Sequence, residues 1–281
     1  MSKQLVKYNN YFNSVPLKTF TATDYNILYA ICAKMRDHGV QNVVFTMAEI
    51  RKMTGFSKNS NEELYAALEQ VYKKIGQIFC KVETEKSLVY FTLFTAFTID
   101  KEQQTLLVSV NEKFAFILND LTKNFTQFEL HEFVELRSKY AKILYKQLKQ
   151  FRTTGFYVVK AEELRTIMDV PEKLPSRKFV ERIVAPAVET LKDEIPGLTC
   201  TPIYNTEKRG HPLDKLKFTF DKDEVAEISM EQEEEMQEKL QETTKPEEET
   251  KPAGKNNSFS NFHQRSYDYD ELERLLTQSQ K

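Results

Sequence analysis

The stretch FYVVKAEELRTIMDVPEKLPSRKFVERIVAPAVETL, residues 156–191, decides the fold. Its first five residues, 156–160, are rich in β-branched and aromatic side chains and predict a strand. A short helical segment follows at 161–168, and the polar stretch 169–175 holds two prolines and predicts a turn. A further helical pattern begins near Ser176. Strand, short helix, turn and helix in this order are typical of a helix-turn-helix unit.

The flanking residues extend this unit to a winged helix-turn-helix. An amphipathic helix is predicted before it at 138–151, and two apolar strands after it at 198–204 and 216–220. The same order of elements occurs earlier in the chain, where the predicted segments are 24–35, 43–46, 46–55, 62–75, 78–82, 89–99 and 106–110. We therefore predict an α+β protein with two tandem winged helix-turn-helix domains rather than a βαβ sheet.

The sequence after these domains changes abruptly in composition. Residues 223–255 contain 12 acidic and 4 basic side chains and no aromatic one, so we expect a disordered acidic linker. Aromatic residues return in 256–281, where Asp268 and Glu271 are spaced to cap a short terminal helix. The candidate partner-binding residues of this docking motif are Phe262, Tyr267, Tyr269, Leu272 and Leu276. A marginal helix without a partner is the alternative.

The division of the chain follows from these patterns. We predict a first winged-helix domain over 1–125, for dimerisation and auxiliary DNA contact, and a second over 126–222 as the main DNA-recognition domain. The formal net charge of −2 conceals an asymmetry, because residues 1–222 carry 33 basic against 26 acidic side chains. The remaining residues, 223–281, carry 7 against 16. A basic body with an acidic tail indicates a protein that meets a polyanion.

The helical pattern at 176–191 carries the strongest candidates for DNA contact. Its basic residues gather at the N-terminal end, where a recognition helix presents side chains to the major groove. The helix dipole disfavours cations there, so fold stability gives little reason for them. We expect Arg177 and Arg182 to contact bases, because arginine can bond guanine O6 and N7 together. Ser176 and Lys178 lie beside them. Pro186 requires the helix to kink or to restart.

Other basic residues form weaker candidate surfaces. The loop between the last two strands supplies Lys208, Arg209 and Lys215, which suit a wing that contacts phosphates or the minor groove. Four lysines share one side of helix 138–151, where they either follow a phosphate backbone or form an ordinary solvated face: Lys139, Lys142, Lys146 and Lys149. In the first domain, Lys58 and Asn59 occupy the corresponding turn.

Several classes of function lack sequence support. The 7 glycines are never close enough for a dinucleotide-binding or P-loop motif, so no nucleotide cofactor is expected. The 4 histidines and 3 cysteines are scattered, which predicts neither a metal site nor a disulfide framework and fits the reducing cytoplasm. No stretch is long and apolar enough to span a bilayer. We expect no catalytic residues and no enzyme activity.

Two sets of residues within about 1–222 form a combined pattern. They are Phe20, Thr21, Asp24, Tyr25, Ile27 and Leu28 near the N-terminus, and Tyr140, Leu144, Tyr145, Leu148, Lys149, Phe151, Gly155, Phe156, Leu164, Arg165, Arg182, Pro186, Ala187 and Glu189. This pattern resembles that of a known family, the RepB-like initiator replication proteins of iteron-carrying theta plasmids. The end of the chain is similar to a C-terminal motif of Gram-positive plasmid initiators and DnaD-like replisome proteins.

This resemblance implies a function in plasmid replication. The family implies binding to directly repeated double-stranded DNA at an origin, help in opening the duplex, and recruitment of the host initiator and helicase-loading proteins. It also implies a homodimer in equilibrium with a monomer, which controls copy number, and repression of the protein's own promoter. A winged-helix transcriptional repressor, a replisome-loading adaptor and a rolling-circle nickase are the alternatives. The nickase is disfavoured because it needs a metal held by closely spaced histidines.

Overall fold

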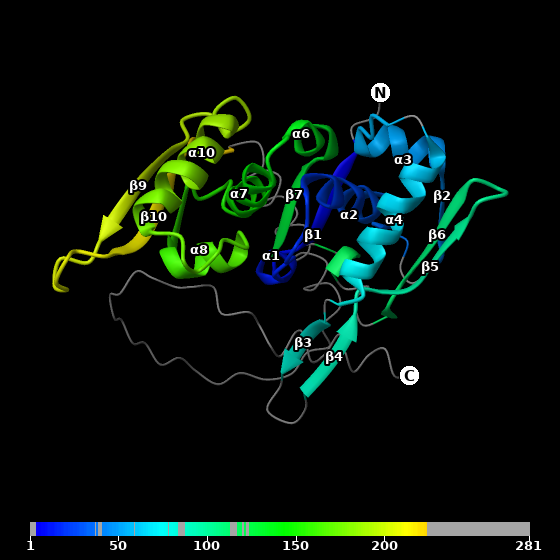
Figure 1. Cartoon of the computed structure of the whole chain (residues 1–281), viewed down its shortest axis with the longest axis horizontal. Helices are drawn as coiled ribbons and strands as arrows, with labels where there is room; N and C mark the ends of the chain where they lie inside the picture. The colour runs from blue at the N-terminus through cyan, green and yellow to red at the C-terminus, as the bar shows by residue number, and fades with distance from the viewer. Residues whose placement is uncertain are drawn as a thin grey trace, which may run out of the picture.

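The computed structural model describes residues 4–36, 38, 41–58, 60–77, 79–83, 88–112, 117–119, 121 and 124–223. Apart from Asp223, the predicted acidic linker and docking motif lie outside these residues. Figure 1 shows the described elements as two groups, joined by a central layer that contains α7 and β7. Each group contains a helix-turn-helix and a small antiparallel sheet, and the prediction of two tandem winged helices is confirmed.

The first winged helix follows the predicted order closely. Its elements are α2 (Ala22–Met35), β2 (Val43–Thr46), α3 (Met47–Thr54), α4 (Asn61–Ile75), β5 (Phe94–Asp100) and β6 (Thr105–Val110). The three strands form an antiparallel sheet in the order β2-β6-β5. The single strand predicted over 89–99 is two strands, because β4 (Leu88–Thr92) pairs with β3 (Phe79–Glu83) and the buried Leu93 separates it from β5.

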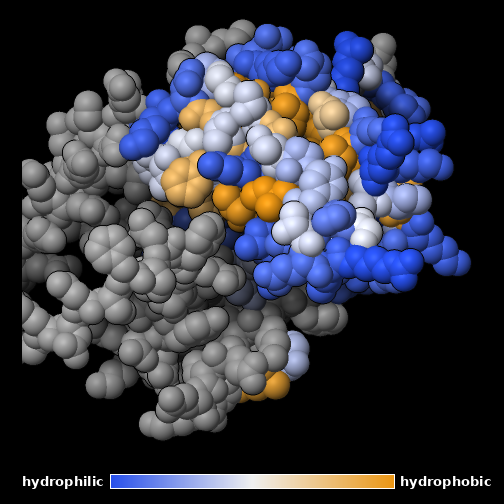
Figure 2. Space-filling model, turned by 90° about the vertical axis from the view of Figure 1, so that its left-hand side faces the viewer, coloured by the Kyte–Doolittle hydropathy of each residue, from blue (hydrophilic) through white to orange (hydrophobic). Residues whose placement is uncertain are grey.

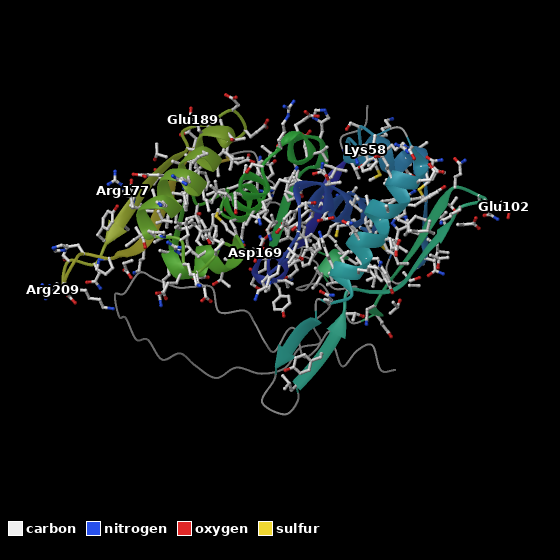
Figure 3. The ribbon with its side chains drawn as sticks, viewed as in Figure 1. Lys58, Glu102, Asp169, Arg177, Glu189 and Arg209 are labelled. Carbon is white, nitrogen blue, oxygen red and sulfur yellow. The ribbon has the colours of Figure 1, made fainter. Side chains whose placement is uncertain are left out.

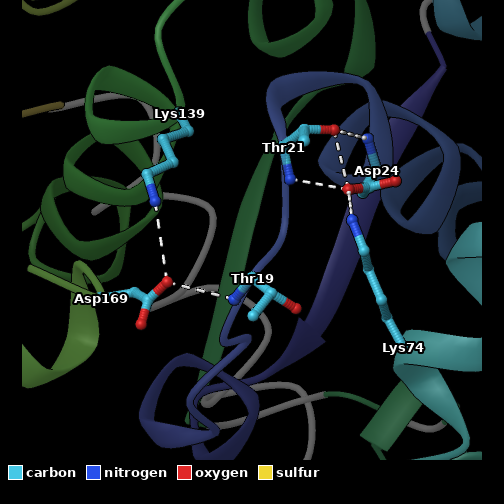
Figure 4. Close-up of polar contacts among 6 residues, drawn as sticks. All are labelled: Thr19, Thr21, Asp24, Lys74, Lys139 and Asp169. Carbon is cyan, nitrogen blue, oxygen red and sulfur yellow. Dashed lines mark hydrogen bonds and ion pairs between the residues drawn. The ribbon is translucent and has the colours of Figure 1, made fainter.

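Helix α2 begins two residues before its predicted start, at a complete capping box. The hydroxyl oxygen of Thr21 accepts from Asp24 N–H, and the Asp24 carboxylate accepts from Thr21 N–H at 2.7 Å. Lys74 of α4 donates to the same carboxylate at 2.5 Å (Figure 4), although Asp24 is almost completely buried. One carboxylate therefore caps α2 and fixes α4 against it.

The second winged helix has the same order. Its elements are α7 (Lys139–Gln150), β8 (Phe156–Lys160), α8 (Ala161–Ile167), α9 (Ser176–Phe179), η1 (Val180–Val184), α10 (Ala185–Leu191), β9 (Thr199–Tyr204) and β10 (Leu213–Thr219). The strands form an antiparallel sheet in the order β8-β10-β9. α9, η1 and α10 follow one another without interruption and together form the recognition helix, residues 176–191.

Pro186 is accommodated by a π-helical turn. In η1 the N–H of Ala185 donates to the carbonyl of Val180, five residues back, and Pro186 then stands in the first turn of α10. A proline lacks the N–H that a regular α-helix would need at this point, and the first turn of a helix tolerates that loss. The recognition helix therefore passes the proline without a break in its helical backbone.

A pairing between distant parts of the chain was not predicted from the sequence. β1 (Leu5–Asn9) pairs antiparallel with β7 (Phe125–Glu129), and α1 (Tyr11–Ser14) and α6 (Leu130–Glu135) follow these strands. The predicted domain boundary between residues 125 and 126 falls at the start of β7, within this pairing. That boundary stays a prediction.

Helix α7 lies between the two winged helices (Figure 1). It packs against α2 and β7 on the side of the first domain and against β8 and α10 of the second. Eight consecutive residues, 141–148, are buried, so no side of the middle of α7 faces solvent. One continuous hydrophobic core therefore runs through both winged helices.

A polar contact also joins the two domains at their surface. The backbone of Thr19, before α2, donates its N–H to Oδ2 of Asp169 at 3.1 Å, and Lys139 Nζ lies 3.7 Å from the same oxygen (Figure 4). Asp169 follows α8 in the second winged helix and has a positive φ of 52°. This carboxylate thus contacts the first domain and α7 at once.

Candidate nucleic-acid interface

The N-terminal half of the recognition helix presents an exposed cationic surface. Ser176, Arg177, Lys178 and Arg182 are all exposed. The opposite side of the helix is buried in the core through Phe179, Ile183, Val184, Ala187, Val188 and Leu191. The predicted clustering of basic residues at the N-terminal end of this helix agrees with their observed exposure. We name the four exposed residues the recognition surface.

Arg177 has one weak partner on its own helix. Its Nε donates to Glu181 Oε1 at 2.6 Å, one turn further along, and this bond raises the pKa of the already cationic guanidinium. The Arg177 side chain keeps 86% of its surface exposed. Solvent screens an exposed pair of this kind strongly, so a phosphate or base can replace Glu181 at low cost. Lys178 and Arg182 have no ion-pair partner in the described part of the chain.

Arg165 of α8 holds the start of the recognition helix in place. Its guanidinium donates to the Leu174 carbonyl at 2.9 Å and to Ser176 Oγ at 3.5 Å. The same group lies 4.5 Å from the centre of the Phe179 ring. Arg165 therefore joins α8, the first helix of the helix-turn-helix, to the turn and to the first turn of the recognition helix. Its role is to position the recognition surface.

The first winged helix contains the same arrangement around Arg51 of α3. Its guanidinium donates to the carbonyls of Lys58 and Ser60, the latter at 2.7 Å, and stacks over Phe56. Four residues after each arginine the backbone turns left-handed, at Gly55 with φ 62° and at Asp169 with φ 52°. The two domains thus share one way of fixing this turn.

Sequence analysis missed these two positioning arginines, although a signal was present. The triplets Glu49-Ile50-Arg51 and Glu163-Leu164-Arg165 stand at the same place in the two copies, and each begins at the third residue of the short helix. The repeated triplet marks Arg51 and Arg165 as equivalent residues of the two domains, whereas their helix faces alone do not distinguish them from other surface arginines.

The loop between β9 and β10 forms the wing. Lys208 and Arg209 are exposed in its turn, and Figure 3 shows Arg209 at the same end of the molecule as Arg177. Asn205 Oδ1 fixes the turn by accepting the N–H groups of Glu207 and Lys208 at 3.0 and 3.3 Å. Lys215 lies inside β10 and is only partly exposed, so it is a strand residue and not part of the loop tip.

The predicted lysine surface of α7 is wrong for its two central members. Lys142 and Lys146 are 0% and 2% exposed, and burial lowers the pKa of each amine to about 7. Lys142 donates to the carbonyls of Phe133 and Val134 at the end of α6. The helical pattern was read as having one core side, but α7 has a neighbouring domain on each side, so neither amine can reach DNA.

The two outer lysines of α7 each form an ion pair with a carboxylate of the same chain. Lys139 lies 3.7 Å from the Asp169 carboxylate, and Lys149 lies 3.5 Å from Glu132. Their side chains are 28% and 21% exposed. The four lysines therefore do not form a free stripe for a phosphate backbone.

The weaker candidates of the first domain are only partly described. Lys58 is exposed and pairs with Glu63 at 2.9 Å across the turn between α3 and α4. Asn59 lies outside the described residues. Among the residues that the structure describes, no three histidine, cysteine or carboxylate side chains gather to hold a metal ion. None of the described helices is both long enough and apolar enough to cross a membrane.

Two winged helices in tandem, the second with an exposed cationic recognition helix, define the class of this protein. The family model described as "Initiator Replication protein, WH1" matches residues 5–149, and that described as "Initiator Rep protein, WH2" matches residues 160–220. The chain belongs to this family of replication initiators.

The chain is similar to a curated protein and to solved structures. A "Probable replication protein rep" from Bifidobacterium longum (strain NCC 2705) is 40% identical over 171 residues, 60% of this chain. The matching region spans 58% of that relative. The fold is also similar to that in the "Crystal structure of Pi initiator protein in complex with iteron DNA", with a TM-score of 0.61 at 15% identity. That match covers 80% of this chain and 99% of the other.

Proposed function

We propose that this protein is a plasmid DNA replication initiator that binds directly repeated origin sequences, the iterons, as double-stranded DNA. The recognition surface is the observation that carries this proposal, because it places exposed cations at the helix end that enters a major groove. Membership of the initiator family supports it. The Pi initiator, whose fold is similar, was solved in complex with iteron DNA.

The recognition surface divides the proposed contacts by chemistry. Arg177 and Arg182 contact guanine edges, since a guanidinium can donate to O6 and N7 together, and Lys178 contacts either a base or a phosphate. Lys208 and Arg209 of the wing contact phosphates or the minor groove beside them. Lys142 and Lys146 take no part, because both are buried.

The remaining functions in the proposal rest on the family resemblance. The initiator promotes opening of the origin in the cytoplasm without catalysing a reaction itself. It recruits the host initiator and helicase-loading proteins through the motif at 256–281. It exists as a homodimer in equilibrium with a monomer, with the first winged helix at the dimer interface, and represses its own promoter.

Footprinting on the DNA upstream of the protein's own gene tests the DNA-binding part. Protections that repeat at a regular interval on tandem sequences in one orientation are expected for an iteron-binding initiator. One protected palindrome would instead favour a transcriptional repressor. Weak protection of every sequence alike would favour a loading adaptor.

A separate experiment tests the recruitment part. Replacing both Tyr267 and Tyr269 by alanine should leave iteron binding unchanged within error, since both residues lie beyond the DNA-binding domains. Plasmid maintenance in the host should fall. Normal maintenance with the double variant would remove the motif from the proposal without affecting the DNA-binding part.

A further inference from the structure

The sheet of the second winged helix has an outer face that the DNA-binding proposal does not use. Along β8 and β10, buried residues such as Tyr157, Val159, Leu216 and Phe218 alternate with residues on the other side. This alternation places Lys160 and Lys217 on the outer face, and both are exposed. The helices of the domain pack on the inner side, and none of the described helices lies over the outer face.

The strand register brings like charges together on this face. Lys215 stands directly opposite Lys160, and the next outward residue of β10, Lys217, stands between Val158 and Thr201. The nine outward positions include three lysines and no acidic residue: Phe156, Val158, Lys160, Lys215, Lys217, Thr219, Thr199, Thr201 and Ile203. Like charges directly opposite each other destabilise a sheet, so an anion on this face would relieve the repulsion.

Apolar side chains lie among these cations. Phe156 and Ile203, at opposite corners of the face, are 49% and 37% exposed. Figure 2 views the end of the molecule where β9 and β10 lie and shows hydrophobic residues gathered among hydrophilic ones. Lys160 and Lys217 have no ion-pair partner within the described residues. The face therefore combines unpaired cations with exposed apolar surface, which suits a partner that is both acidic and apolar.

The chain itself supplies a segment with this chemistry directly after the sheet. Residues 224–238 contain seven glutamates and no lysine or arginine, and among the glutamates stand Val225, Ile228 and Met236. The described chain ends at Asp223, whose N–H donates to the Arg152 carbonyl at 3.0 Å, four residues after β10. An extended chain covers about 3.3 Å per residue, so fifteen residues can reach well past the seven residues of β10.

We propose that the acidic segment 224–238 binds to the outer face of the β8-β10-β9 sheet of its own chain. Its carboxylates pair with Lys160 and Lys217, and its apolar side chains cover Phe156 and Ile203. The segment thereby keeps other polyanions off this face. DNA then engages the domain through the recognition surface and the wing, which lowers nonspecific binding and raises the ratio of specific to nonspecific affinity.

Site-specific photocrosslinking in the full chain tests the contact. Benzoylphenylalanine in place of Ile203 should crosslink to 224–238 within one chain, as mapped by mass spectrometry. The same substitution at Val44, exposed on the sheet of the first domain, is the matched control and should not. Crosslinks from position 203 only to a second chain, or to no part of 224–238, would overturn the proposal.

Charge-neutralising variants test the consequence. Replacing Glu231, Glu233, Glu234, Glu235 and Glu238 together by glutamine should expose the face, so acetylation of Lys160 and Lys217 should rise several-fold while that of Lys73, distant on α4, stays constant. The salt slope for nonspecific DNA should steepen by up to about 2, one each for Lys160 and Lys217. Equal acetylation of Lys160 and Lys217 in wild type and variant would overturn the proposal. It would also be overturned if added DNA reduced the acetylation of these lysines equally in both proteins.

Discussion

Arg182 lies on the exposed side of the recognition helix, one turn beyond Lys178, and has no partner among the described residues. If it contacts guanine, the Arg182→Ala variant should bind its iteron about 1–3 kcal/mol more weakly and accept any base at one position. Binding to a set of iterons mutated base by base measures both effects. Lys192→Ala removes a cation from the far end of the same helix and should leave base preference unchanged. An unaltered base profile for Arg182→Ala would contradict the assigned contact.

Lys146 makes stability depend on pH. Burial lowers the pKa of its amine to about 7 in the folded state, against 10.5 for the ordinary group. Between these values the unfolded chain holds a proton that the folded chain lacks, so stability rises with pH, by up to about 1.4 kcal/mol per unit. Below pH 7 both states are protonated and this contribution is constant. The Lys146→Met variant should therefore gain less stability between pH 7 and 9 than the wild type.

Chemical denaturation at several pH values between 6 and 9 checks this prediction. The upper limit avoids the buried tyrosines, because burial raises the pKa of Tyr8 and Tyr25 above 10 and reverses the sign at higher pH. Lys149→Met, at a partly exposed lysine of the same helix, is the control and should keep the wild-type slope. Parallel slopes for wild type and Lys146→Met would show that this amine is charged in the fold.

At the scale of an element, Arg165 of α8 contacts the turn and the start of the recognition helix. Arg165→Ala removes the bonds to the Leu174 carbonyl and Ser176 Oγ. We expect specific affinity to fall by about 1–2 kcal/mol, because hydrogen bonds to charged groups contribute about that amount and the helix end loses its fixed place. The salt slope should stay constant, since no phosphate contact is lost, whereas Lys178→Ala should reduce it by about one if Lys178 contacts a phosphate.

Arg51 provides the matched control, because it fixes the same turn in the first winged helix. Arg51→Ala should lower the free energy of unfolding about as much as Arg165→Ala does. It should leave base preference at the iteron unchanged. A reduced salt slope for Arg165→Ala would mean that this arginine contacts phosphate directly.

The elements differ in how far their sequences determine them. Most helices and strands of the two winged helices were predicted to within a few residues, because caps such as Thr46 and breaks such as Gly55 act locally, whereas β1, α1, β7 and α6 were not predicted. The burial of the α7 lysines was not predicted, because they lie on a regular polar side of the helix and only tertiary packing buries them, as where Lys142 contacts the carbonyls at the end of α6. The pairing of β1 with β7 joins residues more than a hundred positions apart, and neither strand signals its partner. The exposed recognition surface was predictable because its helix has only one core side.

At the scale of the whole molecule, a buried polar network ties the N-terminus to the shared helix α7. Asn13 Nδ2 donates to Thr126 Oγ1 at 2.7 Å and to Gln150 Oε1 at 2.9 Å. Its Oδ1 accepts from Tyr8 at 2.8 Å, and its backbone carbonyl accepts from Gln147 at 3.0 Å. Asn13 thus links β1, β7 and α7, and α7 belongs to the core of both winged helices.

This connection predicts that the two winged helices unfold together. Asn13→Ala removes the acceptor of the buried Tyr8 hydroxyl and one partner each of Thr126 and the partly buried Gln150, while Thr126 keeps its bond to Asn10. A buried polar group left unsatisfied costs about 1–3 kcal/mol. The variant should therefore lose stability while keeping a single transition, and hydrogen exchange should accelerate equally in α2 of the first domain and α10 of the second. Ser14→Ala, at an exposed neighbour that bonds only within its own turn, should change neither. If exchange accelerates in α2 alone, the domains unfold separately, and α7 does not couple them.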